Sequence, residues 1–237
     1  MIKYAYHTVK NSNVLTRAKA SPDELVLIEN IPNNDQLLEN FLATLGDPIQ
    51  EERNQEAGSI FHVNVEKNDT HFISYANSNL FFPVHTDGSD FKIPPNYVAM
   101  FCVRPSQEGG ESLFVKLSDL IANLPKELLD VLTKKQWLFN TIHRTIITQT
   151  ETATSICYNR LMIESYGKLT QQELDILNHL DRICEEHTFN FKLKANDLIL
   201  FRNDRFLHGR ADFPLDSKRL LKRVRFCEPD LPAGRSV

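Results

Sequence analysis

The sequence lacks the features that mark membrane, secreted and disulfide-rich proteins. Its 237 residues contain no apolar run near the roughly 20 residues that span a bilayer, and no basic-then-apolar leader at the N-terminus. The 4 cysteines lie far apart and form no C-x-x-C pair, so they indicate neither a zinc framework nor a redox motif. We therefore expect a reduced, cytoplasmic protein with no membrane partner.

The sequence also lacks a large excess of either positive or negative charge. The 27 Lys and Arg residues against 31 Asp and Glu residues give a formal net charge of -4, which provides no long-range attraction to nucleic acid or anionic lipid. A content of 41% hydrophobic and 24% charged residues excludes a disordered, collagenous or coiled-coil chain. No internal repeat or linker-like tract divides the chain, so we expect one domain over residues 1–237.

Short apolar and alternating runs predict a mainly β protein. The expected strands cover residues 25–28, 60–65, 97–103, 112–117, 145–148, 189–193, 198–201 and 220–226. Helices are expected over residues 35–45, over residues 118–134 and from Thr170, where Thr170 and Glu173 match a capping box. Many short strands with a few helices predict a sandwich or barrel with helices on one outer face.

The most informative motif is the H-x-D triplet of His85 and Asp87. On an extended backbone, residues two apart point to the same side, so this imidazole and this carboxylate can reach one metal ion. His208, which follows an apolar strand and a polar turn, is the candidate third ligand. Two histidines and one carboxylate form the facial triad of non-haem Fe(II) oxygenases, which leaves three positions for a co-substrate and oxygen. Taken alone, an H-x-D triplet is also typical of a capped turn with a surface histidine.

Two arginines follow His208 at fixed distances in an alternating run. Arg219 and Arg223 lie eleven and fifteen residues after this histidine. An arginine on a strand that returns past a metal is suited to bidentate binding of a carboxylate. The alternative for each of them is a solvated charge on an edge strand.

Together, these segments resemble the taurine dioxygenase/clavaminate synthase-like (TauD/TfdA) group of Fe(II)- and 2-oxoglutarate-dependent oxygenases. The resemblance covers about residues 80–226 and is carried by His85-Thr86-Asp87-Gly88, Pro94-Pro95, Gly109-Gly110-Glu111-Ser112, the Asn203 to Arg210 segment, Arg219 and Arg223. It implies a double-stranded β-helix (jelly-roll, cupin-like) core with flanking helices. The stretch between Asp87 and His208 is short for this group, which implies a reduced substrate-recognition insert.

The resemblance also assigns roles to residues. His85, Asp87 and His208 become the iron ligands. Arg219 pairs with the distal carboxylate of 2-oxoglutarate, and Ser112 takes the place of the hydroxyl residue, usually Thr, that hydrogen-bonds this co-substrate. Arg223 is expected near the other carboxylate end of the co-substrate.

The implied activity is oxidation, most simply hydroxylation, of an unactivated C–H bond in a small polar metabolite such as an amino acid or a natural-product intermediate. Fe(II) is the cofactor, 2-oxoglutarate and O2 are co-substrates, and succinate and CO2 are released. Related halogenases lack a carboxylate at the position of Asp87, which favours hydroxylation. Desaturation or cyclisation, a non-catalytic cupin-like binding protein and a zinc hydrolase are the alternatives, and nothing in the sequence singles out the general base that a hydrolase needs.

Four polar residues flank the metal motifs and are candidates for substrate contact. Tyr75, Asn77 and Asn79 precede the H-x-D triplet, and Arg210 follows His208 by two residues. The alternative for the first three is a role in the turn before the metal-binding strand.

Overall fold

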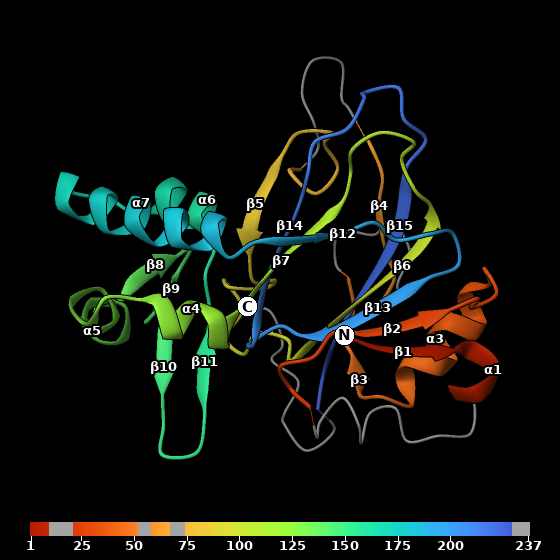
Figure 1. The fold of residues 1–237 in the computed structure, drawn as a ribbon, viewed down its shortest axis with the longest axis horizontal. Coiled ribbons are helices and arrows are strands. Elements are labelled where there is room, and N and C mark those ends of the chain that lie inside the picture. The colour runs from red at the N-terminus through yellow and green to blue at the C-terminus, as the bar shows by residue number, and fades with distance from the viewer. Residues whose placement is uncertain (10–20, 52–57, 67–73, 229–237) are drawn as a thin grey trace.

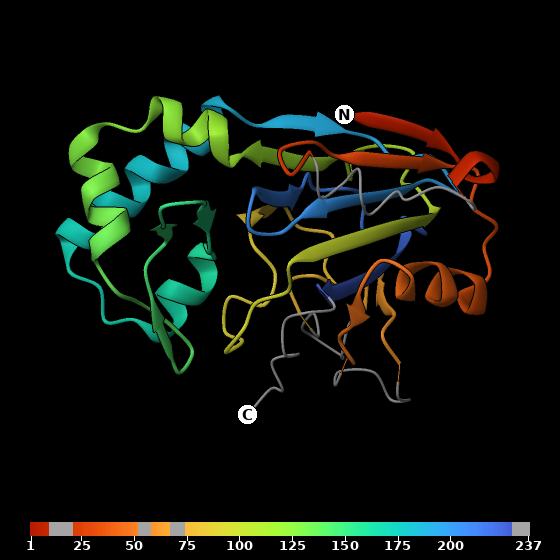
Figure 2. The same ribbon diagram turned by 90° about the horizontal axis from the view of Figure 1, so that it is seen from below.

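Two β-sheets that face each other form the centre of the structure (Figures 1 and 2). The computed structural model describes residues 1–9, 21–51, 58–66 and 74–228. Apolar side chains of both sheets pack together between them, with Met100 and Ile199 of the larger sheet beside Phe114 and Phe206 of the smaller one. The mainly β core with flanking helices that the sequence predicts is therefore confirmed.

The larger sheet combines strands from both ends of the chain. In spatial order it contains β1 (Ile2–Ala5), β2 (Val26–Glu29), β13 (Leu198–Arg202), β6 (Tyr97–Arg104), β15 (Leu220–Cys227) and β3 (Asp47–Pro48), while β4 (Phe61–Val63) also pairs with β15. Its strand pairs are antiparallel except β1 with β2, which is parallel. Side chains alternate along each strand, so every second residue of β15 points toward the smaller sheet.

The smaller sheet carries most of the sequence motifs. Its antiparallel strands, in spatial order, are β12 (Phe189–Phe191), β7 (Ser112–Lys116), β14 (Phe206–Arg210) and β5 (Phe82–His85). Two hairpins stand apart from both sheets and join β8 (Trp137–Phe139) to β9 (Ile142–Arg144), and β10 (Ile147–Gln149) to β11 (Thr154–Ile156). As a result, β14 lies between the strand that ends in His85 and the strand that begins with Ser112.

Helices cover the outer sides of both sheets. After the short α1 (Tyr6–Val9), helix α3 (Asp35–Ala43) packs Leu38 and Leu42 on the larger sheet. The helices α4 (Leu117–Asn123), α5 (Lys126–Lys134), α6 (Arg160–Tyr166) and α7 (Gln171–Glu186) share a second cluster with Val115 and Leu207 of the smaller sheet (Figure 2). The prediction of helices on one outer face is wrong, because both sheets carry apolar side chains on their outer sides and each side needs a cover.

The helix expected over residues 118–134 is divided into α4 and α5. Leu124 and Pro125, which lie between the two helices, have extended backbones with ψ of 127° and 144°. Proline disfavours the helical conformation of the residue before it, which explains why α4 ends there. The predicted capping box at the start of α7 is confirmed, since Thr170 and Glu173 each accept a hydrogen bond from the other's backbone N–H. Among the helices of the described residues, none has the length and apolar character that crossing a membrane requires.

The buried residues Leu177, Leu180, Ile183 and Cys184 form an apolar stripe along α7, and this stripe provides a test of the packing. Leu180 is fully buried against the other helices, and its replacement in Leu180→Ala leaves a cavity. We expect the free energy of unfolding, measured by urea denaturation, to fall by about 2–5 kcal/mol. The control Gln172→Ala, on the exposed side of the same helix, is expected to change it by less than about 0.5 kcal/mol. Equal effects of the two changes would contradict the burial of this stripe.

Candidate active site

Strand pairing brings the H-x-D triplet and the distant histidine together. His85 ends β5 and His208 lies on β14, and the two residues are direct partners in the antiparallel register. The turn after β5 is fixed by Asn203, whose side chain accepts a hydrogen bond from the Asp87 N–H at 2.9 Å and donates one to the Asp87 carbonyl at 2.9 Å. Because Asn203 immediately follows β13, the larger sheet holds Asp87 beside the two histidines of the smaller sheet.

The three side chains leave a space of the right size for a metal ion. Nε2 of His85 lies 3.6 Å, and Nε2 of His208 3.8 Å, from Oδ1 of Asp87. One ligand atom from each residue lies within 4.8 Å of the others, and all three residues are buried. An ion about 2 Å from each ligand atom fits between them. Nδ1 of His85 contacts the carbonyl of Pro83 at 2.8 Å, so its Nε2 is the nitrogen that faces the ion.

The electrostatics of the site favour the protonation states that bind a metal. Burial, together with the neighbouring His85, lowers the pKa of His208 to about 3, so His208 is neutral at pH 7. Burial raises the pKa of the Asp87 carboxyl, but Arg223 and His85 outweigh it and hold this pKa well below its usual range. Neutral imidazole and ionised carboxylate are the forms that coordinate divalent metals. The donor set therefore fits Fe(II), which imidazole and carboxylate ligands bind in non-haem oxygenases.

A narrow cavity of about 40 Å³ leads from His208 to Arg219 and is also lined by Ser112 and Arg223. Nη1 of Arg219 is buried and has no hydrogen-bond partner in the described part of the chain. Burial lowers the pKa of this guanidinium to about 10, and it stays charged at pH 7. A buried cation without a partner is costly, and a carboxylate ligand relieves that cost.

Gly110 makes room for this guanidinium. Its φ of +69° suits glycine, and a Cβ at this position would lie 3.1 Å from both Cδ and Nε of Arg219. The ring of Phe213 packs against the same guanidinium, with its centroid 5.3 Å from Cζ of Arg219. Ser112, which the sequence predicts as the co-substrate's hydroxyl partner, begins β7 and lies in the same cavity.

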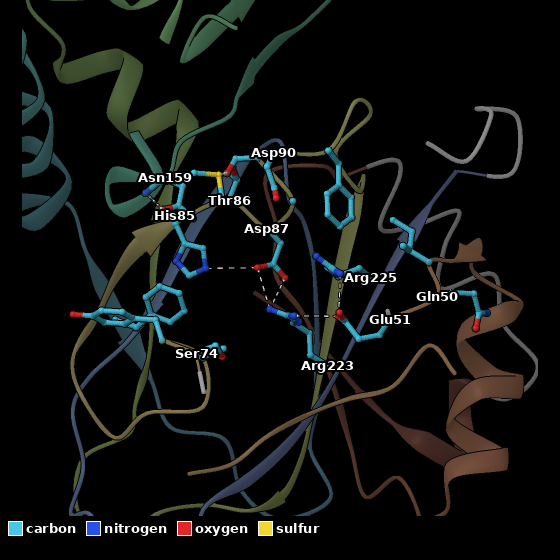
Figure 3. Close-up of a pocket in the computed structure, with 18 residues that line it drawn as sticks. Gln50, Glu51, Ser74, His85, Thr86, Asp87, Asp90, Asn159, Arg223 and Arg225 are labelled. Carbon is cyan, nitrogen blue, oxygen red and sulfur yellow. Dashed lines mark hydrogen bonds and ion pairs between the residues drawn. The ribbon is translucent and has the colours of Figure 1, made fainter. Parts of the chain in front are cut away.

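A wider cavity of about 350 Å³ opens on the other side of the metal-binding residues (Figure 3). Its wall includes the metal-binding candidates His85 and Asp87. Asp90 and two arginines of β15, Arg223 and Arg225, also line it. Figure 3 shows Arg223 between Asp87 and Glu51, with dashed contacts to both. Nη1 of Arg223 lies 3.2 Å from Oδ1 and 3.1 Å from Oδ2 of Asp87. Arg223 thus lines both cavities, while Glu51 and Arg225 are site residues that the sequence analysis did not identify.

The four candidate substrate residues differ in where their side chains lie. Tyr75 lines the wider cavity and packs on Phe82, with ring centres 5.2 Å apart. Asn77 donates hydrogen bonds at 3.2 Å to the carbonyls of His62 and Asn64. Asn79 donates one at 2.9 Å to the carbonyl of Phe213. Asn77 therefore connects this segment to β4, and Asn79 connects it to the segment after β14, while their contact with substrate stays a prediction.

Arg210 lies on β14 and is directed at the loop that precedes β5. Its guanidinium donates hydrogen bonds to the carbonyls of Ala76 at 3.1 Å and Leu80 at 2.8 Å, and to Oγ of Ser78 at 3.4 Å. Burial, followed by repulsion from Arg219, lowers the pKa of Arg210 to about 9. Through these contacts, Arg210 helps to hold the described segment of Tyr75 beside the metal-binding strands.

Comparisons with known proteins agree with this arrangement. The model of the taurine catabolism dioxygenase TauD, TfdA family matches residues 22–225. Among solved structures, asparagine oxygenase in complex with Fe(II), 2S,3S-3-hydroxyasparagine and succinate is similar, with a TM-score of 0.74 at 12% identity, covering 91% of this chain and 78% of that chain. No curated protein sequence matches the chain.

Two further structures have the same fold. A taurine dioxygenase from Burkholderia xenovorans has a TM-score of 0.73 at 18% identity, over 99% of this chain and 89% of that chain. PvcB from Pseudomonas aeruginosa has a TM-score of 0.69 at 17% identity, over 92% of this chain and 80% of that chain. These similarities confirm the predicted double-stranded β-helix core.

The contacts of Arg210 generate a test of its part in the site. Arg210→Gln removes the donors that reach residues 76–80, and we expect amide hydrogen exchange of these residues to accelerate at least tenfold. The free energy of unfolding is expected to fall by about 2–4 kcal/mol, because buried carbonyls lose charged donors. The exposed Arg104 provides a control in Arg104→Gln, for which exchange in this loop stays unchanged. Unchanged exchange in Arg210→Gln would contradict the assigned role.

Proposed function

The chain belongs to the taurine catabolism dioxygenase TauD, TfdA family and is an Fe(II)- and 2-oxoglutarate-dependent dioxygenase, and we propose that His85, Asp87 and His208 bind its iron. The observation that carries this assignment is the convergence of the three buried side chains from β5, the following turn and β14 on one point. A zinc hydrolase would use the same three ligand types, but the family model is that of a dioxygenase family and nothing in the sequence singles out the general base that a hydrolase needs. Arg219, a buried cation reached through a cavity that His208 also lines, matches the need for a dianionic co-substrate.

Within this proposal, the residues around 2-oxoglutarate have separate tasks. Arg219 binds the distal carboxylate in the narrow cavity, and Gly110 and Phe213 hold its guanidinium in place. The Ser112 hydroxyl donates a hydrogen bond to the same co-substrate. When bound, Fe(II) supplies the oxidising chemistry that couples decarboxylation of 2-oxoglutarate to oxidation of the substrate. The protein orients both molecules and excludes water from the space between them.

The substrate is a small polar metabolite, such as an amino acid or a natural-product intermediate, and it occupies the wider cavity. A volume of about 350 Å³ suits a small molecule. The charged wall of the cavity favours a polar ligand, and Tyr75 provides a partly exposed aromatic surface at one side. The solved structure of asparagine oxygenase with hydroxyasparagine, and that of OrfP with (3R,4R)-dihydroxy-L-Arg, support an amino acid as the first class to test. Hydroxylation is the proposed outcome.

The proposed activity is tested by turnover of 2-oxoglutarate with a panel of amino acids, with succinate and product masses measured together. We expect succinate to form in an Fe(II)- and O2-dependent manner, and one panel member to gain the mass of one oxygen atom. A loss of two hydrogens instead would replace hydroxylation by desaturation or cyclisation. Arg219→Gln is expected to raise the half-saturating 2-oxoglutarate concentration at least about tenfold, because a charged pair is lost. Arg182→Gln, on the exposed side of α7, is the matched control.

Absence of succinate above the level of iron-free protein would contradict the dioxygenase activity of this chain. An unchanged half-saturating concentration of 2-oxoglutarate in Arg219→Gln would contradict the assigned co-substrate site. It would not contradict the assigned metal site.

A further inference from the structure

The middle residue of the H-x-D triplet has contacts that the proposed function does not use. Successive side chains of an extended segment point to opposite sides, so Thr86 is directed away from the space between His85 and Asp87 (Figure 3). Its side chain lies against Tyr158, in the segment that joins β11 to α6. Thr86 is 1% exposed and Tyr158 is 0% exposed, so this contact is closed to solvent.

Both the backbone and the side chain of Thr86 bond to Tyr158. The Thr86 N–H donates a hydrogen bond to the Tyr158 carbonyl at 2.7 Å, and Oγ1 of Thr86 accepts one from the Tyr158 N–H at 3.0 Å. The same hydroxyl lies 3.3 Å from the Tyr158 carbonyl and 3.8 Å from Sγ of Cys157, either of which can accept its proton. The hydroxyl therefore satisfies a buried N–H, which a methyl group in its place cannot do.

The segment of Tyr158 is itself bound to both parts of the structure. The N–H of Ile156 donates a 3.0 Å hydrogen bond to the carbonyl of Asp204, in the turn between β13 and β14. The hydroxyl of Tyr158 donates one to Oδ1 of Asp181 on α7. Oδ2 of the same carboxylate accepts one from Nη1 of Arg160 at 2.9 Å. Tyr158 is thus a fixed partner for Thr86, because it is held by the β core and by α7.

The turn that carries Asp87 is consequently held from two sides. On the side of the larger sheet, Asn203 bonds to the N–H and the carbonyl of Asp87. On the side of the helices, Thr86 bonds to Tyr158. Because Thr86 lies between His85 and Asp87, its backbone conformation sets how these two side chains face each other. Groups that orient metal ligands without touching the metal change metal affinity by about 10- to 100-fold.

We propose that Thr86 is a positioning residue of the metal site. Its hydroxyl, bonded to Tyr158, holds the turn in the conformation that lets the three proposed ligands share one metal ion. The helices α6 and α7 therefore contribute to the metal site without supplying a ligand. This inference rests on the proposed function, because it takes His85 and Asp87 as iron ligands.

The test uses Co(II) in place of Fe(II). Co(II) accepts the same imidazole and carboxylate ligands. It is stable in air, and its visible absorption bands report the number and arrangement of its ligands. The dissociation constant is measured by calorimetric titration of the purified chain, and the bands are recorded at saturation. Neither readout requires turnover or knowledge of the substrate.

Thr86→Val keeps the shape of the side chain and removes the hydroxyl. We expect its affinity for Co(II) to fall at least about tenfold and its visible bands to change in position. Thr86→Ser keeps the hydroxyl and loses a methyl group, and we expect wild-type bands and an affinity within about threefold of wild type. A merely structural role would not distinguish the two variants in this order. Unchanged affinity and bands in Thr86→Val, or a Thr86→Ser variant as weak as Thr86→Val, overturn the proposal.

Urea denaturation of the metal-free variants shows whether each of them folds. If Thr86→Val does not fold, Thr86→Ala decides the proposal, because it also lacks the acceptor for the Tyr158 N–H. We expect Thr86→Ala to bind Co(II) at least about fivefold more weakly than wild type, and wild-type affinity and bands overturn the proposal. Thr152→Val, in the exposed loop between β10 and β11, is the matched control, with an affinity within about twofold of wild type.

Failure of the proposed function gives a different result. If the wild-type protein binds Co(II) no more tightly than the double variant His85→Ala, Asp87→Ala, the proposed iron site and the role of Thr86 are both overturned. If the wild-type protein binds more tightly than this double variant and Thr86→Val equals wild type, the iron site stands and the positioning role alone is overturned.

Discussion

The pairing of β14 with β5 is the constraint on which the remainder of the site depends. It sets His208 opposite His85 in the smaller sheet, although 122 other residues separate them in sequence. Asn203 then connects the turn of Asp87 to the end of β13. A shift of β14 by one residue would turn His208 to the side that packs on the helices, because successive side chains of a strand alternate. The buried clusters on both sides of the smaller sheet oppose such a shift, so the packing of the core also fixes the geometry of the site.

Buried charge is the second feature on which the site depends. Arg219 lies directly before β15, and Arg223 and Arg225 lie on it. Their surroundings differ, although Glu51 contacts both Arg223 and Arg225. Arg219 has a buried nitrogen with no partner in the described residues, Arg223 contacts Asp87, and Arg225 contacts Glu51. Isolated buried cations are unfavourable, so the acidic partners Asp87 and Glu51 stabilise this row of arginines. We propose that 2-oxoglutarate, bound at Arg219, relieves the remaining electrostatic cost at this end of the row.

The residues of this site that stand in motifs could be predicted from sequence, and the residues that no motif marks could not. The spacing of His85 and Asp87 and the position of Arg219 after His208 carried enough pattern to suggest a metal and an anion site, and the comparisons support that family assignment. Glu51 stands in a polar stretch without a motif, and only the pairing of β3 with β15 brings it to Arg225. Asn77, Asn79 and Arg210 were predicted near the substrate because of their position in sequence. Their hydrogen bonds connect neighbouring segments of the chain, Arg210 also lines the narrow cavity, and their contact with substrate stays a prediction. Strands such as β3, with two residues, are too short for any periodicity to mark them.

The central claim is that His85, Asp87 and His208 form an iron site in which 2-oxoglutarate binds. The most direct measurement is the visible absorption of the anaerobic protein loaded with Fe(II), before and after addition of 2-oxoglutarate. We expect a weak charge-transfer band in the wild-type protein, and no band in the double variant His85→Ala, Asp87→Ala. A wild-type protein without the band, or a double variant that keeps it, would contradict the assigned metal site.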